Sequence, residues 1–327
     1  MTVRIGTRAS KLALTQTQQT ADKLAAVGGF PVELVHIKTE GDVKTGSLSQ
    51  MGGTGVFVAA LRDALLADTC DVAVHSLKDL PTGSALGLSI AATPQRVDVR
   101  DVLCARDGMT LAELPAGAKV GTGSPRRAAQ LRAARPDIEV LDIRGNVDTR
   151  LGRVPGLPGN ATDEVVPGKS CDLDAVVLAA AGLERIDRRD TVSEYFGTDV
   201  MLPAPGQGAL AIECRTEDAP AQGSNGVLAQ ALAALNDDDT RLAVTAERAV
   251  LARLEAGCAA PVGAYAFRKG SMLHLEAVVC AVDGTKTVRE KKATDGLTEV
   301  GATLLGIEVA ELLLAAGAAE IADLAAS

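Results

Sequence analysis

The sequence predicts an α/β protein with two successive α/β lobes and a third, smaller α+β domain. Short apolar strands alternate with helical segments in the first part of the chain, and this alternation restarts after Thr93. The pattern changes near Gln222, where two consecutive helical segments precede a group of strands. The length of 327 residues is consistent with two or three domains.

The first lobe is predicted to place four polar residues on one rim. Ser10 is a typical N-cap for the first helix. Residues 40–54 are rich in Gly and polar residues and form a candidate mobile loop. Strands are predicted at Val3–Ile5, Val32–Thr39, Asp71–His75 and Leu88–Ala92, and helices at Lys11–Val27 and Val56–Ala67. Ligands bind beyond the carboxyl ends of such strands. We therefore expect one rim to hold Arg8, Ser10, Lys78 and Asp79.

The second lobe repeats the pattern and carries a second set of polar strand ends. Strands are predicted at Val102–Ala105, Lys119–Gly121, Glu139–Ile143 and Ala175–Leu178, and helices at Pro125–Ala134, near Val147–Leu151 and near Ala180–Arg185. The polar residues at its strand ends are Thr122, Ser124, Arg126, Arg127, Arg144 and Arg185. Residues 152–170 are rich in Gly and Pro, which is typical of a surface insertion. Residues 201–215 are predicted to be a turn leading into a strand.

The third domain is predicted to combine helices with a few strands. Helices are expected at Gly226–Leu235, Asp238–Ala256 and Leu297–Ala316, and strands near Val262–Phe267 and Met272–Val282. The expected division of the chain is 1–98 plus 209–222 for the first domain, 102–200 for the second and 226–327 for the third.

The arginine-rich stretch Lys119–Arg153 is the best candidate for a binding site. It contains seven arginines and four acids in a chain whose formal net charge is −9. Ser124 and Pro125 are typical of a helix start, which would place Arg126 and Arg127 in the first turn. Cations there are unfavourable by about 0.3–1 kcal/mol each. A bound anion would remove this conflict, and the alternative is that both arginines extend into solvent.

Composition excludes several classes of function. The acidic balance and the aromatic content of 2% argue against nucleic acid as a partner. The N-terminus lacks an apolar signal core and no long apolar run follows, so we expect a cytoplasmic protein that does not span a membrane. Six cysteines without a close pair and three histidines give weak support for a metal site, and we expect none.

Three short motifs have a simple structural interpretation as well as a functional one. Residues 206–211 match the spacing of a dinucleotide fingerprint, but a strand-like run follows where a helix is required, so we reject that interpretation. Lys78 and Asp79 are either a solvated ion pair or a catalytic acid beside a base. Cys258 is either a buried, inert thiol or an approachable one among small residues.

Together these motifs resemble one family, the porphobilinogen deaminases, also called hydroxymethylbilane synthases. The matching stretches are RIGTRASKLALTQ at the start, GGTGVF at 52–57, HSLKDLPT at 75–82, GTGSPRR at 121–127, RGNVDTRL at 144–151, LPAPGQGALAIECR at 202–215 and AERAVLARLEAGCAAPVGAYA at 246–266. They cover nearly the whole chain in family order. Family members often have lysines in the glycine-rich loop, where this chain has Gln50 and Thr54.

The resemblance implies an activity and a cofactor. Four porphobilinogen molecules would be joined head to tail into hydroxymethylbilane, with release of ammonia, in tetrapyrrole biosynthesis. The enzyme would build its own dipyrromethane cofactor and hold it through a thioether to Cys258. Asp79 would be the catalytic acid. Further cofactor contacts would come from Lys78, Asp79, Thr122, Ser124, Arg126, Arg127 and Arg144, and substrate contacts from Arg8, Ser10, Arg144, Arg150 and Arg185.

The resulting expectation is a monomeric enzyme with two periplasmic-binding-protein-like α/β lobes facing each other across a cleft, into which the third domain presents Cys258. One alternative is a solute-binding module, which predicts no reactive cysteine and usually requires an export signal. The other is an inactive family member, which the intact Asp79, Cys258 and six matched arginines oppose.

Overall fold

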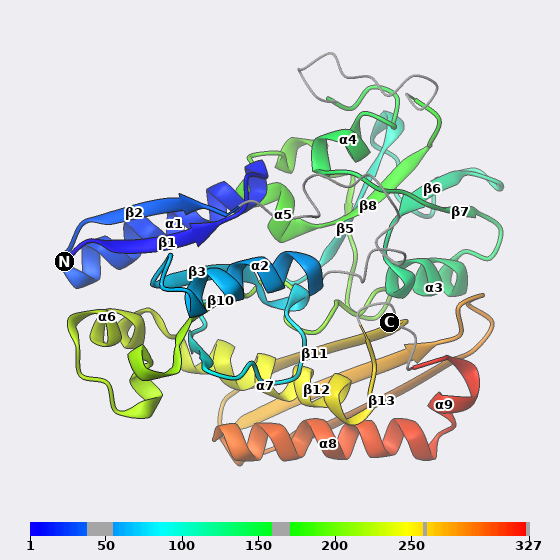
Figure 1. The fold of residues 1–327 in the computed structure, drawn as a ribbon. Helices are drawn as coiled ribbons and strands as arrows, with labels where there is room; N and C mark the ends of the chain where they lie inside the picture. The colour runs from blue at the N-terminus through cyan, green and yellow to red at the C-terminus, as the bar shows by residue number, and fades with distance from the viewer. Residues whose placement is uncertain (38–54, 159–170, 258–259, 325–327) are drawn as a thin grey trace.

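Three β-sheets organise the protein. The computed structural model describes residues 1–37, 55–158, 171–257 and 260–324. Figure 1 shows two α/β lobes, one coloured mainly blue to cyan and one mainly green, above a third domain coloured yellow to red. The predicted fold class is confirmed, because the first two sheets are mixed and flanked by helices while the third is purely antiparallel.

The first lobe is built on a five-stranded sheet in the order β2-β1-β3-β10-β4. Its elements are β1 (Val3–Thr7), α1 (Lys11–Gly28), β2 (Val32–His36), α2 (Gly55–Leu66), β3 (Val72–Ser76), β4 (Leu88–Ala92) and β10 (Leu210–Arg215). β1, β2 and β3 are parallel, and β10 runs antiparallel to both of its neighbours. The chain therefore leaves this lobe after β4 and returns to it with β10.

The second sheet has the same plan, in the order β7-β6-β8-β5-β9. Its elements are β5 (Asp101–Ala105), β6 (Lys119–Thr122), α3 (Pro125–Ala134), β7 (Glu139–Asp142), α4 (Val147–Leu151), β8 (Ala175–Ala179), α5 (Ala180–Arg185) and β9 (Glu194–Tyr195). In each lobe the fourth strand is antiparallel and is contributed by the chain just after it crosses from the other lobe. Two crossover segments, 93–100 and 196–209, therefore connect the lobes side by side.

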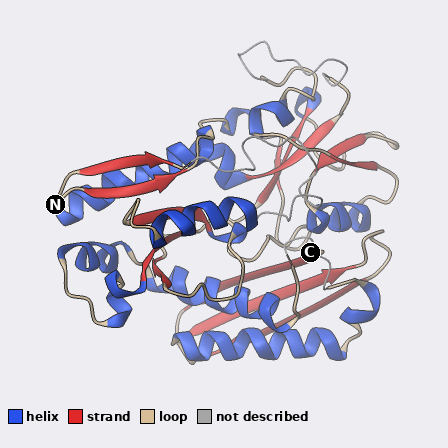
Figure 2. Ribbon diagram, viewed as in Figure 1, coloured by secondary structure: helices blue, strands red, loops and turns tan. Residues whose placement is uncertain are grey.

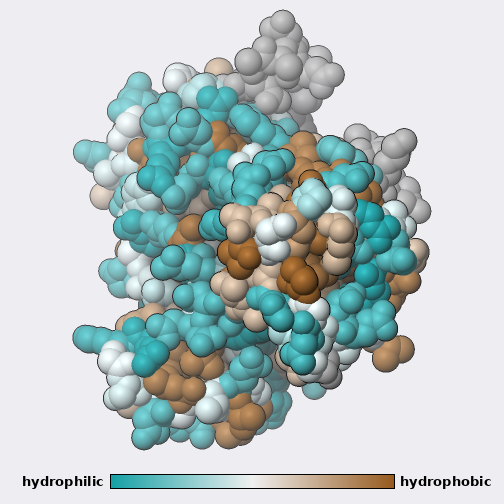
Figure 3. Space-filling view, turned by 90° about the vertical axis from the view of Figure 1, so that its left-hand side faces the viewer, coloured by the Kyte–Doolittle hydropathy of each residue, from teal (hydrophilic) through white to brown (hydrophobic). Residues whose placement is uncertain are grey.

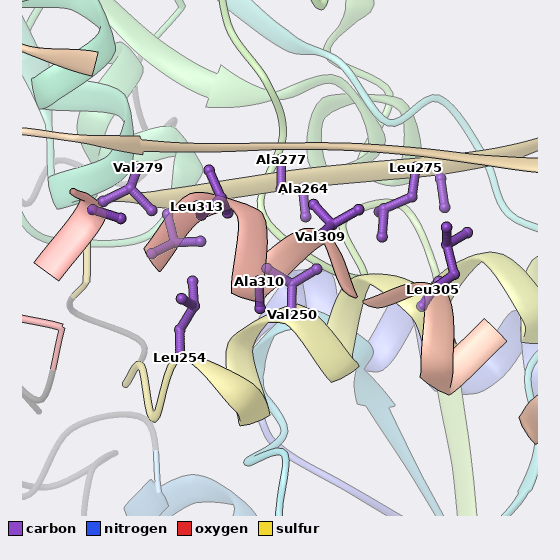
Figure 4. Packing of buried hydrophobic residues seen from close by; sticks show 14 of the residues in the cluster. Val250, Leu254, Ala264, Leu275, Ala277, Val279, Leu305, Val309, Ala310 and Leu313 are labelled. Atoms are coloured by element: carbon purple, nitrogen blue, oxygen red, sulfur yellow. The ribbon is translucent and has the colours of Figure 1, made fainter. Parts of the chain in front are cut away.

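The third domain is an antiparallel sheet covered by helices. Its elements are α7 (Asp238–Arg253), β11 (Val262–Lys269), β12 (Met272–Cys280), β13 (Thr287–Thr294), α8 (Glu299–Ala315) and α9 (Ala318–Ile321). α7 and α8 pack against each other and against the sheet, and Figure 4 shows Val250 and Val309 among the residues of this core. The core is aliphatic, as expected for a chain with 2% aromatic residues.

Most predicted elements are present, with some differences at their ends. The bounds of β4, α3, α4 and α5 agree with the prediction, and Figure 2 shows the alternation of helix and strand in both lobes. β13 and β9 were not predicted. β13 reads TVREKKAT and lies at an edge of its sheet, where charged side chains are common. β9 spans two residues, too few for a periodic signal.

Helix α6 (Val227–Leu235) packs on the first lobe. Its residues Leu228, Ala231 and Leu232 share a hydrophobic core with strands β1, β3 and β10. From the sequence this segment is expected to belong to the third domain. We propose instead that the first lobe includes residues 209–235 and that the third domain begins with α7.

Figure 3 shows a largely hydrophilic face on which hydrophobic side chains gather in a few separate groups. Among the described residues, no helix combines the length and apolarity that a membrane crossing requires.

A buried ion pair joins both crossovers to the third domain. The guanidinium of Arg96 contacts both carboxylate oxygens of Glu247, at 2.6 and 3.0 Å. The same carboxylate accepts the backbone N–H groups of Gly206 and Ala266, at 2.6 and 2.8 Å. Arg96 also donates to the backbone oxygen of Gln207 at 2.8 Å. The charge of Glu247 is paired with Arg96, and its carboxylate oxygens also accept backbone hydrogen bonds. Glu247 can therefore be fully buried.

Candidate active site

The rim predicted for the first lobe is present. β1 and β3 are parallel neighbours, so the residues that follow them lie at the same edge of the sheet. Arg8 and Ser10 follow β1, and Lys78 and Asp79 follow β3 in a short 3-10 turn, Leu77–Asp79. Leu77 is buried, and its backbone N–H donates to the oxygen of Ala209 at 3.1 Å. The second crossover therefore fixes the turn that carries Lys78 and Asp79.

The second lobe brings its own strand ends to a corresponding edge. β6 lies between the parallel strands β7 and β8. Thr122 and Ser124 follow β6, and Arg144 follows β7. The Ser124 hydroxyl accepts the backbone N–H of Arg127 at 3.5 Å, and Pro125 is the first residue of α3, as the sequence indicated.

Arg126 and Arg127 do not extend into solvent, which contradicts that alternative. Their exposed fractions are 3% and 6%, and both contact the carboxylate of Asp101 at the start of β5. Nη2 of Arg126 lies 2.8 Å from Oδ2 of Asp101, and Nη2 of Arg127 lies 2.7 Å from Oδ1. An acid of the protein itself therefore partly offsets the two charges that the first turn of α3 brings together.

Gln207 joins this ion cluster to the first lobe. Its side-chain nitrogen donates to Oδ1 of Asp101 and to the oxygen of Val99, each at 2.8 Å. Its side-chain oxygen accepts from Nζ of Lys78 at 3.3 Å and from Nη2 of Arg127 at 3.4 Å. Lys78 of the first lobe and Arg127 of the second lobe are thus held by the same amide.

The cluster lowers the pKa values of its acid and of its bases, for different reasons. Burial alone would raise the pKa of Asp101, but the charges of Arg126 and Arg127 outweigh it and hold that pKa at about 2. Burial, followed by the charge of Arg127, lowers the pKa of Lys78 to about 8. Burial, followed by repulsion from Arg127 and Arg144, lowers the pKa of Arg150 to about 10. The site is therefore short of negative charge.

The remaining candidate residues have local partners. Ser10 caps α1 by accepting the backbone N–H of Ala13 at 3.3 Å, and the Thr122 hydroxyl accepts the N–H of Ser124 at 3.3 Å. Arg144 is exposed and lies 3.4 Å from Asp142.

Arg150 and Arg185 each donate to a backbone oxygen. Arg150 donates to Gly145 at 2.8 Å, and Arg185 to Gly208 at 3.1 Å, on the second crossover. Burial lowers the pKa of Arg185 to about 10. Asp79 is partly buried and accepts no hydrogen bond from any described residue, although its charge raises the pKa of Lys78.

Some predicted features lie outside the described residues. These are Cys258, the loop with Gln50 and Thr54, and residues 159–170 of the insertion. The nearest described elements around Cys258 are α7, which ends at Arg253, and β11, which begins at Val262. No group of metal-ligating side chains occurs in the described part of the chain.

Two buried polar residues, Asp101 and Gln207, were missed by the sequence analysis. Asp101 gives no local signal, since its partners lie on a helix that begins after an intervening strand. Gln207 had a usable signal, because glycines stand on both sides of it. Gly206 and Gly208 have φ values of +77° and +85°, which glycine adopts without strain.

The cluster suits a ligand with several carboxylates. Lys78, Arg126 and Arg127 lie around the buried carboxylate of Asp101, and Arg150 adds a fourth cation near Arg127. Nε of Arg126 is buried and has no acceptor among the described residues. Guanidinium groups bind carboxylates in charge-assisted, often bidentate pairs. A dipyrromethane, whose pyrrole rings bear acetate and propionate groups, has the charge and hydrogen-bonding groups that this donor set requires.

Fold and site together define a three-domain α/β protein with a cluster of cations at the junction of two lobes. Residues 3–223 match the family model described as porphobilinogen deaminase, dipyromethane cofactor binding domain, and residues 241–315 match the model of the porphobilinogen deaminase C-terminal domain. The porphobilinogen deaminase of Cutibacterium acnes is 55% identical, with 99% of this chain and 98% of that protein covered. That of Thermobifida fusca is 52% identical, with 99% and 97% covered.

The chain belongs to the porphobilinogen deaminase family. It is accordingly a transferase of tetrapyrrole biosynthesis with hydroxymethylbilane synthase activity and a dipyrromethane cofactor. Among solved structures, a periplasmic substrate-binding protein from Coxiella burnetii matches with a TM-score of 0.41 and 16% identity, covering 71% of this chain and 91% of that one. That similarity is too low to support the fold assignment, which rests on the sheets described above.

Proposed function

We propose that the cationic junction between the lobes holds the carboxylates of the dipyrromethane cofactor and of the growing pyrrole chain. The observation that carries this proposal is the excess of buried and half-buried cations around Asp101 and Asp79. Each pyrrole unit brings two carboxylates, so a chain of several units is a small polyanion. Neutralising it while fixing its geometry requires several guanidinium groups.

Within this proposal the residues have separate roles. Cofactor carboxylates are bound by Lys78, Arg126, Arg127 and Arg144, with further contacts from Asp79, Thr122 and Ser124, and substrate carboxylates by Arg8, Ser10, Arg144, Arg150 and Arg185. The hydroxyls of Ser10, Thr122 and Ser124 already accept backbone N–H groups, which leaves their O–H groups to donate. Cys258 carries the cofactor through a thioether.

Asp79 is the catalytic acid in this proposal. The bound cofactor would supply the nucleophilic pyrrole carbon to which the first unit is added, and each later unit would be added to the terminal ring of the growing chain. Loss of ammonia from porphobilinogen leaves a delocalised cation, which a nearby carboxylate stabilises. Asp79 suits this role because it lies in the turn that follows β3 and accepts no hydrogen bond from the described residues. Its carboxylate can also hold and return the proton exchanged at a pyrrole position.

The test is the Asp79→Asn variant with a matched control. The amide keeps the shape of the side chain but can neither carry the negative charge nor exchange the proton. We expect the variant to retain its cofactor, measured by intact mass, while kcat for hydroxymethylbilane formation falls by about 100-fold or more. Asp68→Asn, on the exposed surface next to Arg4, should leave kcat unchanged. Turnover of Asp79→Asn within a few-fold of the parent would remove this residue from the mechanism.

We also propose that the enzyme works as a cytoplasmic monomer that takes porphobilinogen as its substrate, without a metal, a nucleic acid or a membrane partner. The net charge of −9 supports the absence of a nucleic-acid partner. Sedimentation velocity over a range of concentrations tests the oligomeric state, and a concentration-dependent dimer would contradict it.

A further inference from the structure

The Gly206-Gln207-Gly208 turn is the one motif of the sequence analysis to which the family activity gives no role. Gln207 has no exposed surface, and its side-chain amide makes the four hydrogen bonds described above. Two of its partners belong to the first crossover and β5, one to the turn after β3, and one to α3. A single amide therefore touches both lobes and the first crossover.

The chemistry of its partners fixes the orientation of this amide. The nitrogen faces two acceptors, the carboxylate of Asp101 and the oxygen of Val99. The oxygen faces two cations, Lys78 and Arg127. A flipped amide would direct its NH2 group at two cations and its oxygen at two acceptors, which loses all four hydrogen bonds. The oxygen must therefore point at Lys78.

The two glycines hold the amide in this place. A Cβ on Gly208 would lie 2.7 Å from the backbone oxygen of Val97, on the first crossover. A Cβ on Gly206 would lie 3.3 Å from the backbone nitrogen of Lys78. The turn is thus packed between the first crossover and Lys78, and a side chain on either glycine would be crowded. Both glycines also have positive φ, which other residues rarely adopt.

We propose that Gln207 is a positioning residue that holds the ammonium group of Lys78 beside Asp79 and ties it to Asp101 of the second lobe. Lys78 and Asp79 are adjacent in one short turn, so the direction of the lysine side chain affects the field at the carboxylate. This inference rests on the proposed function, because it assigns Gln207 a part in the same site. It differs from the contacts proposed above in that Gln207 acts through Lys78 and need not touch the ligand.

If Gln207 positions Lys78, each substitution of Gln207 should change the pKa of Lys78 in a definite direction. The charged groups that face Lys78 are Asp79 in its own turn, Arg126 and Arg127 on α3, and Asp101 on β5. Gln207→Met keeps the length of the side chain but removes an acceptor for the ammonium form, so the pKa of Lys78 should fall. Gln207→Glu places a carboxylate there, so the pKa of Lys78 should rise.

The experiment measures this pKa in the cofactor-bearing enzyme. The ¹³Cε resonances of labelled lysines are followed against pH, and the Lys78 signal is assigned by its loss in Lys78→Arg. We expect shifts of opposite sign in the two Gln207 variants and a fall in kcat of about tenfold or more for Gln207→Met. Unchanged pKa values, or shifts of the same sign, would overturn the proposal. If Gln207→Met does not fold, Gln207→Asn withdraws the oxygen from Lys78 and should shift the pKa in the same direction.

Gln130→Met is the matched control. Gln130 is also a buried amide, but it binds the backbone of Leu202 and does not contact Lys78. It should lower stability and leave the pKa of Lys78 unchanged, and an equal pKa shift in this variant would show that Gln207 is merely structural. Intact mass distinguishes failure of the proposed function from failure of the proposed role of Gln207. Absence of a bound dipyrromethane in the parent would contradict the proposed function. A parent that carries the dipyrromethane, together with an unchanged pKa of Lys78 in the Gln207 variants, would contradict only the role of Gln207.

Discussion

Nη2 of Arg127 lies 2.7 Å from Oδ1 of Asp101, and this pair joins the first turn of α3 to the first residue of β5. Arg126 shares the same carboxylate. The residues expected to bind an external anion are thus already oriented by an internal one. Pre-orientation of this kind reduces the entropy lost when a ligand is bound. It also means that substitutions here affect folding as well as binding.

Removal of the charge of Asp101 should destabilise the protein. Asp101→Asn leaves two buried arginines without their carboxylate, and loss of one partner of a buried ion pair typically costs about 3–5 kcal/mol. The measurement is urea unfolding at pH 7. Asp172→Asn, which removes the partner of Arg153 at the surface, should cost less than about 1 kcal/mol.

The pH dependence of this effect has a definite sign. The pKa of Asp101 is about 2 in the folded protein and ordinarily 3.8, so the folded state favours the ionised form. The difference in unfolding free energy between the parent and Asp101→Asn should therefore be constant above pH 4. It should become smaller as the pH falls from about 4 towards 2. A difference that widens over that interval would contradict the assignment.

Substitutions at the junction between the crossovers and the third domain should also destabilise the protein. Glu247→Gln leaves the buried guanidinium of Arg96 without its countercharge, so we expect a loss of about 3–5 kcal/mol in unfolding free energy. Glu311→Gln breaks the exposed pair with Arg253 and should cost less than about 1 kcal/mol. Similar losses in the two variants would show that Glu247 does not anchor the junction.

Cofactor assembly should depend on the charge of Lys78. Its pKa of about 8 means that the ammonium form, which binds carboxylates, is lost as the pH rises through 8. Cofactor-free protein incubated with porphobilinogen should therefore gain mass more slowly above pH 8. Lys78→Arg keeps its charge and should remove this decline. An unaltered alkaline decline in that variant would assign the titration to another group.

Arg150 should contribute to substrate binding and little to stability. Burial and two neighbouring arginines disfavour its charge, so its replacement relieves repulsion. A charge-assisted hydrogen bond is worth about 1.5–3 kcal/mol, so Arg150→Met should lower kcat/KM by about 10- to 100-fold. The control is Arg153→Met, whose arginine pairs with Asp172 on the surface. Equal kinetic losses in both variants would refute a specific role for Arg150.

The sequence predicts those parts of the structure that depend on neighbours in the chain. Ser124 and Pro125 fix the start of α3, and the apolar run at β4 fixes that strand. The pairing of Arg126 and Arg127 with Asp101 could not be predicted, because it depends on the position that β5 takes beside β8 after the crossover. The charge of the first turn of α3 indicated that an anion was needed, but not that the protein supplies part of it.

Arg126 should contribute to folding as well as to the cofactor site. Arg126→Ala removes a proposed cofactor contact, so it should impair cofactor assembly. Because Arg126 is buried and also donates to the oxygen of Leu202 at 2.6 Å, the same substitution should lower stability measurably. Unfolding and intact mass should therefore be measured on the same preparation of that variant. Full stability with full cofactor content would contradict both roles.

The central claim is that Cys258 carries a dipyrromethane whose carboxylates the junction of the lobes binds. Its most direct test is the intact mass of the purified protein, compared with those of Cys258→Ser and of Cys171→Ser, which replaces an exposed free thiol. The account predicts that the parent and Cys171→Ser exceed their sequence masses by one dipyrromethane, whereas Cys258→Ser has its sequence mass alone. A parent at its bare sequence mass, or a Cys258→Ser protein that keeps the added group, would contradict the account.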